Sequence, residues 1–397
     1  MKKNNVRKVM VLLAVMFLVI SLVSCQQPEA QETTSEEVAT DEAAETTSSE
    51  SGETAEVQYE YPVVFNEEIK VAVIRNEGMS DHCAQMFKGA VASGESLGFT
   101  VDTMITGGDD VKFQDMVQQS IDAGYDGLVL SHGKQEYSYD LVQTIIDAGI
   151  PVVTFDTVPL DADGNQPVGV TVTQQADADL ARESLNALIQ YCQENLGVEV
   201  PRIITTFYGP GVPPLDRRME TLNTEYIDTG KLELVDVVTI SDMNNMIADM
   251  QTHFAAMLNK YPEGSFDAVW GMADIFTQGC YMGAEDVGRL GEFPFFAIDC
   301  SDTDLDYMRQ EGSPWMTSTA VDAAMIGDVV VRILAVKMAG EETPDSYNFA
   351  PSTIWQDQLT PETNVTNLGE IVPSWGVCDD FQPEWMAALK EAVSAGE

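Results

Sequence analysis

The chain has 397 residues, of which 65 are acidic and 20 are basic, so its formal net charge is −45 at neutral pH. A surface this negative argues against binding nucleic acid or anionic lipid, because phosphate-rich partners select positive charge. It also disfavours a strongly anionic small ligand.

The first 25 residues have the features of a secretory signal. Four basic residues within the first eight positions precede the apolar run Val9–Ile20, which is too short for the roughly 20 residues that span a bilayer. The segment closes with Leu22-Val23-Ser24-Cys25, which resembles the bacterial lipobox, in which the cysteine is lipidated and becomes the mature N-terminus. We therefore expect a lipoprotein signal peptide over 1–25 and a lipid anchor on Cys25, with an ordinary signal peptide as the alternative.

Residues 26–60 read as a disordered acidic tether. Gln26–Gln58 contains ten acidic residues and no lysine, arginine or aromatic residue. Such a segment buries too little apolar surface to offset its ordering entropy, and its like charges keep it extended. Structured sequence is expected from Tyr61 onward, and the remaining length exceeds what one hydrophobic core usually supports.

The next segment alternates short apolar runs with amphipathic stretches, which indicates an α/β lobe with a parallel sheet covered on both faces. Gly124 and Gly149 each follow an Asp-Ala pair and stop a predicted helix just before a strand. Predicted strands are Lys70–Ile74, Thr100–Ile105, Gly127–Leu130 and Val152–Phe155, and predicted helices are Asp81–Leu97, Val111–Ala123 and Tyr137–Ala148.

The pattern then restarts, which predicts a second, similar lobe. Its strands are expected at Arg202–Tyr208, Leu232–Ile240, Ala268–Trp270 and Phe295–Ile298, and its helices at Ala176–Glu194, Pro214–Thr229, Asn244–Lys260 and Ile275–Val287. Later in the chain, extended segments are expected at Trp315–Ala320 and Ser352–Trp355 and helices at Ala323–Ala339 and Pro383–Ser394. The fold class is therefore α/β, with two Rossmann-like doubly wound lobes.

Four sequence blocks at predicted strand ends carry a family resemblance. They are Asp122–Ser131 (DAGYDGLVLS), Ile150–Asp156 (IPVVTFD), Asp267–Asp274 (DAVWGMAD) and Ala297-Ile298-Asp299. In order and spacing, over roughly 69–355, they resemble the type 1 periplasmic binding proteins, the ribose- and galactose-binding group that serves ABC transporters. The resemblance implies a ligand cleft between two lobes joined by three crossover segments, near Thr173, Thr319 and Ser352.

The resemblance also implies boundaries and site residues. The first lobe would be 61–173 with a return segment at 321–355, and the second 174–320. Residues 356–397 exceed the length of the compact family members, and we expect this C-terminal extension to pack back across the hinge. Ligand contacts are implied at Asn76, Ser80, His82, Cys83, Ser131, Asp156, Arg218, Asp274 and Asp299. Carboxylates at such positions accept hydrogen bonds from sugar hydroxyls, and charge-assisted bonds of this kind are roughly twice as strong as neutral ones.

The chain departs from the ribose-binding pattern at several of these positions. Ribose binders carry phenylalanines where this chain has His82 and Cys83, an asparagine at the place of Ala273 and an arginine at the place of Thr157. Ribose itself is therefore not expected, whereas another sugar or small polar solute is.

These observations predict a lipid-anchored, extracytoplasmic bacterial protein that captures a small polar ligand, first of all a monosaccharide, and delivers it to an ABC permease. We expect a monomer without cofactor, metal site or catalytic residues, attached to the membrane only by its anchor. A sensing subunit for a membrane receptor is one alternative. An esterase is the other, since Gly94–Gly98 fits Gly-x-Ser-x-Gly, although a helix is predicted before Ser96 where the esterase elbow needs a strand.

Overall fold

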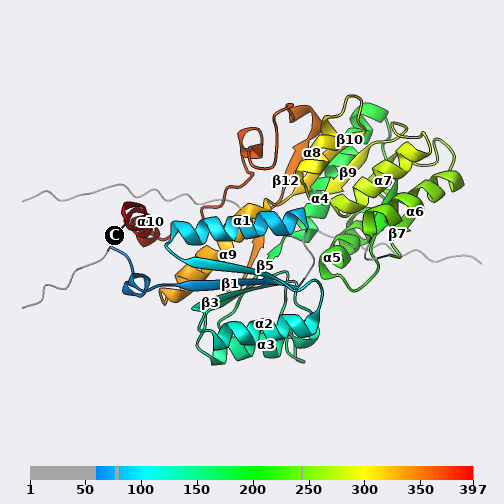
Figure 1. The fold of residues 1–397 in the computed structure, drawn as a ribbon. Helices are drawn as coiled ribbons and strands as arrows, with labels where there is room; N and C mark the ends of the chain where they lie inside the picture. Colours follow the sequence, from blue (N-terminus) through cyan, green and yellow to red (C-terminus); the bar gives the residue numbers. More distant parts are fainter. Residues whose placement is uncertain (1–59, 77–79, 243–244, 397) are drawn as a thin grey trace, which may run out of the picture. The chain divides into compact units, whose positions relative to one another are not determined.

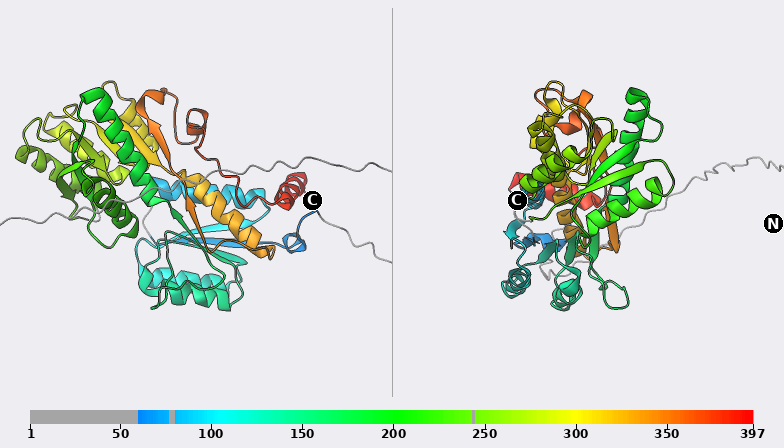
Figure 2. Two further views of the ribbon diagram at one scale, coloured as in Figure 1. Left: turned by 180° about the vertical axis from the view of Figure 1, so that it is seen from behind. Right: turned by 90° about the vertical axis from the view of Figure 1, so that its right-hand side faces the viewer.

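The computed structural model describes residues 60–76, 80–242 and 245–396. The predicted signal peptide, the lipidation site Cys25 and nearly all of the predicted tether lie outside the described residues. The described part contains two six-stranded sheets (Figures 1 and 2). We refer to each sheet with the helices that pack on it as the first and the second lobe.

All strands of the first sheet are parallel. In spatial order they are β11 (Ser346–Phe349), β5 (Thr171–Gln175), β4 (Val152–Phe155), β3 (Gly127–Ser131), β1 (Lys70–Arg75) and β2 (Thr100–Ile105). Helices α1 (Asp81–Ser96) and α9 (Ala323–Met338) cover one face, and α2 (Asp110–Asp122) and α3 (Gln135–Asp147) cover the other (Figure 1). Side chains that alternate along β1 therefore enter two cores, Val71 and Val73 under α1 and α9, Ala72 and Ile74 under α2 and α3.

The second sheet has the same order of parallel strands plus one antiparallel edge strand. In spatial order the strands are β12 (Ser352–Trp355), β10 (Trp315–Ala320), β9 (Phe295–Ile298), β8 (Ala268–Gly271), β6 (Arg202–Phe207) and β7 (Glu233–Thr239), with β12 antiparallel to β10. Its helices are α4 (Asp177–Tyr191), α5 (Pro213–Thr221), α6 (Met246–Lys260), α7 (Asp274–Asp286) and α8 (Asp302–Arg309). The large side chains Trp270 and Trp315 are fully buried in its core.

The chain passes between the two lobes at three described places. Strand β5 belongs to the first sheet, and the helix that follows it, α4, packs on the second. Strand β10 belongs to the second sheet, and the next helix, α9, packs on the first. Strands β11 and β12 are consecutive but pair in different sheets, so residues 352–355, which the sequence assigns to the return segment of the first lobe, lie in the second sheet.

The C-terminal extension contacts both lobes. Its segment up to Trp375 contributes Val365, Leu368, Val372 and Trp375 to the core of the second lobe. Its last helix, α10 (Glu384–Ala395), contributes buried side chains to the core of the first lobe instead, next to α1. A chain segment that adds to both cores increases the apolar surface that folding buries.

Helices α1 and α9 pack so closely that glycine is required where they meet. A Cβ atom on Gly327 of α9 would lie 2.0 Å from the backbone oxygen of Met86 in α1. Overpacking of this kind costs about 1–3 kcal/mol or more, so Gly327→Ala should lower the free energy of unfolding by at least that amount in urea titrations. The change Lys88→Ala on the exposed face of α1 is the control, with an expected effect within about 0.5 kcal/mol. Equal stability of both variants would contradict the close packing.

The predicted fold class is confirmed, and the differences lie in polar or short elements. The sequence missed β5, β11 and α8, because their segments lack the apolar runs that predict a buried strand or a long helix. The predicted helices over 176–194 and 214–229 each change to π-helical turns, at Cys192–Leu196 and Leu222–Ile227.

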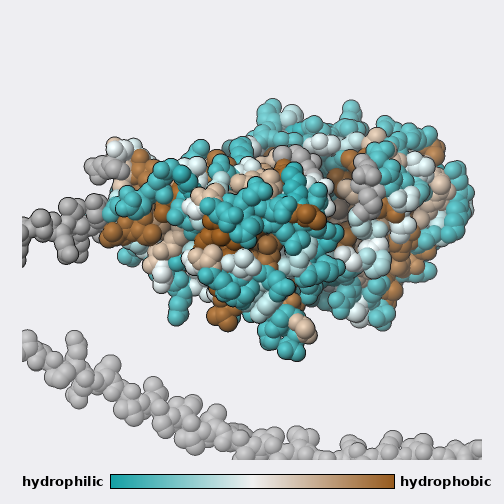
Figure 3. Space-filling model, turned by 60° about the horizontal axis from the view of Figure 1, so that its bottom comes forward, coloured by the Kyte–Doolittle hydropathy of each residue, from teal (hydrophilic) through white to brown (hydrophobic). Residues whose placement is uncertain are grey.

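Hydrophilic residues cover most of the face in Figure 3, and hydrophobic ones form smaller, separate groups. None of the described helices combines the length and the hydropathy that crossing a membrane requires. In the described part of the chain, Cys83, Cys192, Cys280, Cys300 and Cys378 form no disulfide.

Candidate ligand-binding site

Three parallel strands, the neighbouring β3 and β4 of the first sheet and β9 of the second, are each followed by a non-glycine residue in the left-handed backbone region. His132 follows β3 with φ 60°, Asp156 follows β4 with φ 47°, and Asp299 follows β9 of the second sheet with φ 71°. This conformation costs a non-glycine residue free energy and is concentrated at binding sites. Ligands of open parallel sheets bind beyond the carboxyl ends of the strands, where these residues lie.

Asp156 is the most deeply buried acidic group at the end of the first sheet. Its side chain is 2% exposed, and its Oδ1 atom has no hydrogen-bond partner among the described residues. Arg217 Nη2 lies 4.0 Å from Oδ1, and His132 Nε2 lies 4.0 Å from Oδ2. Burial, reinforced by the neighbouring Asp177 carboxylate, raises the pKa of Asp156 to about 7.

Asp177, the first residue of α4, binds two consecutive arginines of α5. Its Oδ2 atom accepts hydrogen bonds from Arg217 Nε and Nη2 at 3.0 and 2.6 Å. Its Oδ1 atom accepts one from Arg218 Nε at 2.8 Å. Asp177 and Arg218 are both buried, so this ion pair is shielded from solvent.

Arg218 connects this pair to the end of β9. Its Nη1 atom donates to the Met272 carbonyl at 2.6 Å and to Asp299 Oδ2 at 3.4 Å. The other carboxylate oxygen of Asp299, Oδ1, is buried and has no hydrogen-bond partner among the described residues. A continuous network therefore runs from Asp156 through Arg217, Asp177 and Arg218 to Asp299, and each end presents a carboxylate oxygen to which no described residue donates.

Asp274 lies beside this network at the start of α7. Burial, followed by the nearby Asp304 and Asp299 carboxylates, raises the pKa of Asp274 well above its usual range. Asp304 in turn accepts hydrogen bonds from Gln278 and from Ser301. Asp274 and Asp304 therefore form a buried carboxyl pair in the second lobe.

Asn76 anchors a second polar group at the end of β1. Its Nδ2 atom donates to Asp110 Oδ1 at 2.7 Å and to the Tyr137 hydroxyl at 3.0 Å, and its Oδ1 atom accepts from Thr106 at 2.5 Å. Lys134 also binds the Asp110 carboxylate.

The predicted ligand contact Ser131 lies between the polar group around Asn76 and the network that contains Asp156. The backbone N–H of Asn76 donates to the Ser131 carbonyl at 2.9 Å. The hydroxyl of Ser131 is 2.7 Å from His132 Nδ1, which places it next to the surroundings of Asp156.

The other three predicted residues lie at the start of α1 and are placed differently. Ser80 is the exposed N-cap of α1 and accepts from the Cys83 backbone N–H. The His82 ring stacks on Phe155 at the end of β4, with ring centroids 6.2 Å apart. Cys83 is fully buried in the core of the first lobe. His82 therefore contacts the strand end that carries Asp156.

Neither Asp177 nor His132 was predicted from the sequence to be a ligand contact. Asp177 lies in no recognisable motif. Its partners are Arg217 and Arg218, 40 and 41 residues later in the chain, and such a distant pairing leaves no local sequence pattern. His132 could have been found from its position, since it follows a predicted strand that neighbours the strand before Asp156.

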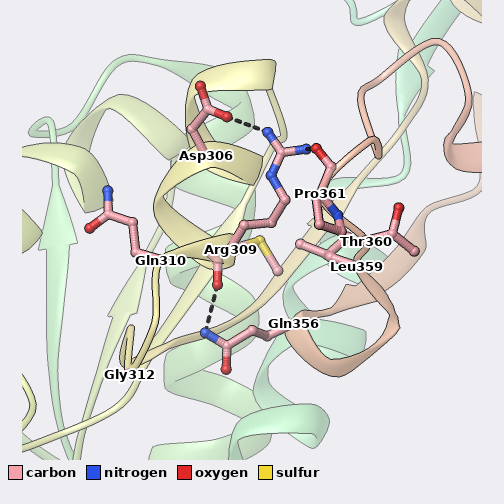
Figure 4. A pocket seen from close by; sticks show the side chains of 9 residues that line it. Asp306, Arg309, Gln310, Gly312, Gln356, Leu359, Thr360 and Pro361 are labelled. Carbon is pink, nitrogen blue, oxygen red and sulfur yellow. Dashed lines mark hydrogen bonds and ion pairs between the residues drawn. The ribbon is translucent and has the colours of Figure 1, made fainter.

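Other features do not compete with this network. A cavity of about 530 Å³ lies between α8 and the C-terminal extension, where Arg309 binds Asp306 and the backbone carbonyl of Pro361 (Figure 4). None of the predicted site residues lines it.

Within the described residues no cluster of His, Cys, Asp and Glu could hold a metal ion. Ser96 ends helix α1 and donates to the Ser93 carbonyl, so it does not form the strand-to-helix elbow of an esterase.

A family model described as "Periplasmic binding protein domain" matches residues 71–342. The chain belongs to this family of periplasmic binding proteins. Its two sheets have the arrangement of the type 1 fold, which confirms the family and fold predicted from the sequence. Proteins of this family bind solutes outside the cytoplasm, and the chain is a solute-binding protein rather than an enzyme.

Solved structures agree with this assignment. A sugar ABC transporter protein from Yersinia enterocolitica is 38% identical, with a TM-score of 0.75, and the match covers 84% of this chain and 98% of that one. A 5-methylthioribose transporter solute-binding protein from Thermotoga lettingae, solved with 5-methylthioribose, is 24% identical, with a TM-score of 0.72 and coverages of 83% and 99%. An ABC transporter solute-binding protein from Agrobacterium vitis, solved with allitol, is 19% identical, with a TM-score of 0.62 and coverages of 73% and 96%. A search of curated proteins finds no significant match.

Proposed function

We propose that this periplasmic binding protein captures an uncharged sugar or sugar alcohol between its two lobes and delivers it to an ABC permease. Asp156 and Asp299 would accept hydrogen bonds from hydroxyl groups on opposite sides of the ligand. Arg218 would orient Asp299, and Asn76 and Ser131 would complete the wall of the first lobe. His82 would lie against the ligand beside Phe155, and Asp274 would contribute from the second lobe.

One observation carries the proposal: each lobe presents a buried carboxylate oxygen that has no hydrogen-bond partner among the described residues, Asp156 Oδ1 in one and Asp299 Oδ1 in the other. Burying such an acceptor without a hydrogen bond costs free energy. A ligand that donates a hydrogen bond to it removes this cost, which favours binding. Sugars and sugar alcohols carry several hydroxyl donors at fixed spacing.

The charges of the same network favour a ligand without charge. Arg217 and Arg218 are both bound by Asp177, and Lys134 is bound by Asp110. An anionic ligand would have to displace one of these carboxylates, and the strongly negative chain as a whole opposes it. Phosphorylated and carboxylated sugars are therefore expected to bind weakly.

The structural neighbours that were solved with 5-methylthioribose, allitol and D-allose support ligands of this chemical class. Isothermal titration calorimetry against these three compounds, D-galactose, D-xylose and an amino acid tests the substrate class. We expect heat with at least one sugar or sugar alcohol and none with the amino acid. Heat with the amino acid alone would contradict the proposal.

We further propose that lipid on Cys25 holds the protein to the cell membrane. The change Cys25→Ala should move the protein from the membrane fraction of its bacterial host to the soluble or secreted fraction, because the protein would lose the acyl chains that anchor it. Fractionation followed by immunoblotting measures this, with Cys83→Ala as a control that leaves the predicted lipidation site intact. Retention of Cys25→Ala in the membrane fraction would exclude the anchor.

A further inference from the structure

We propose that Asp177 is the positioning residue of the site: it holds Arg217 toward Asp156 of the first lobe and Arg218 toward Asp299 of the second. This inference rests on the proposed function, because it assigns the residue that orients the two ligand-binding carboxylates. Asp177 itself would not touch the ligand.

The geometry of the network supports this division of roles. Both oxygens of Asp177 are used, Oδ2 for two bonds to Arg217 and Oδ1 for one bond to Arg218. The nitrogen Arg217 Nη2 that bonds Asp177 is also the one 4.0 Å from Asp156 Oδ1. Arg218 uses Nε for Asp177 and keeps Nη1 for Asp299 and the Met272 carbonyl. One carboxylate thus fixes which atoms of each arginine face the ligand site.

The position of Asp177 in the chain makes it suited to this task. It is the first residue of α4, directly after the passage from β5 of the first sheet to the second lobe. Its side chain is fully buried, so its ion pair with the buried Arg218 is shielded from water, whereas Arg217 is 33% exposed and reaches the solvent side of the site. The guanidinium of Arg217 also lies beside Gln174 of β5, on the first lobe. Arg217 therefore contacts both lobes, through Gln174 of the first and Asp177 of the second.

Asp177 also influences the charge of Asp156. The charged and titratable groups around Asp156 come from β1, the end of β3, α4 and α5, and they are Arg75, His132, Asp177, Arg217 and Arg218. Asp177 is the acidic member of this set, and next to burial it is what raises the pKa of Asp156. Removing its charge should therefore lower that pKa, whereas a purely structural role would not.

The test compares Asp177→Asn with Asp179→Asn. Asp179 lies in the same first turn of α4, but it is exposed and pairs with Arg182, so it controls for the loss of a charge at this helix end. D-allose binding is measured by calorimetry from pH 5.5 to 8.5, or binding of allitol or 5-methylthioribose if either binds more tightly. The carboxyl of Asp156 is titrated by ¹³C NMR in the ligand-free protein.

We expect the native protein to bind more weakly as the pH falls through about 7, because protonation removes the negative charge that strengthens the hydrogen bonds accepted by Asp156. Asp177→Asn should weaken binding by about tenfold or more at pH 8 and move the Asp156 titration to lower pH. Asp179→Asn should change neither. Native affinity together with an unmoved Asp156 titration in Asp177→Asn would overturn the inference.

A second variant, Asp177→Glu, covers the case in which Asp177→Asn does not fold. It keeps the charge but displaces both arginines by one methylene, so it should weaken the binding while the Asp156 titration stays near the native value. Native affinity in Asp177→Glu would exclude a positioning role. If no sugar or sugar alcohol binds the native protein, the proposed function fails, and the NMR titration still decides whether Asp177 acts on Asp156.

Discussion

Asp156→Ala should weaken binding of the preferred sugar by about 30-fold or more, which corresponds to about 2 kcal/mol. The reason is that Asp156 lies buried at the end of β4 with one carboxylate oxygen that lacks a donor among the described residues. A ligand hydroxyl that loses this acceptor is desolvated without compensation. Calorimetry at pH 8, where the carboxyl is mostly ionised, measures the effect.

The stability of the same variant separates lost binding from lost folding. Burial, then Asp177, raises the pKa of Asp156 from 3.8 to about 7, so the folded protein binds this proton more tightly than the unfolded chain does. The contribution of this carboxyl to stability is therefore greatest at low pH and is lost as the pH rises through about 7. At pH 8 the ligand-free variant should unfold at no lower temperature than the native protein.

The exposed change Asp163→Ala is the matched control for affinity, and equal affinities of the two variants would remove Asp156 from the site.

Arg218→Met should lower the free energy of unfolding by about 3–5 kcal/mol and abolish measurable sugar binding. Arg218 is 2% exposed and bonds Asp177, Asp299 and the Met272 carbonyl. Its removal leaves the buried carboxylate of Asp177 with one arginine fewer and Asp299 without its cation. Urea denaturation monitored by tryptophan fluorescence measures the loss.

Arg182→Met provides the comparison, because it also removes an arginine that bonds two carboxylates. Arg182 pairs with Asp179 and Glu225 on the exposed surface, where such pairs contribute about 1 kcal/mol or less. A similar decrease of about 1 kcal/mol or less in the free energy of unfolding of both variants would mean that the buried position of Arg218 does not strengthen its ion pairs.

Most of the fold could be predicted because hydrophobic periodicity determines it. Val71 to Ile74, Leu128 to Leu130 and Phe295 to Ile298 are short continuous apolar runs, each followed by a polar residue, the pattern of strands in a sheet covered on both faces. The strands β5 and β11 could not be predicted in this way. Thr171–Gln175 and Ser346–Phe349 are polar, and they become strands because neighbouring strands and the passage between lobes hold them in register.

The candidate site was predictable to the extent that it follows strand ends. Asp156 and Asp299 follow apolar strands, and the family resemblance implied both of them and Arg218 as ligand contacts. Asp177 was not found, since the pairing of a carboxylate with arginines 40 and 41 residues away is decided by tertiary structure. Cys83 shows the opposite case, because a sequence match at the start of α1 falls on a side chain that the structure buries in the core.

A crystal structure of the protein with the best-binding sugar or sugar alcohol tests the central claim most directly. We predict one compound bound between the lobes, with its hydroxyl groups within hydrogen-bond distance of both Asp156 Oδ1 and Asp299 Oδ1. A compound bound elsewhere, for example in the cavity beside Arg309, or one that contacts neither carboxylate, would contradict the account.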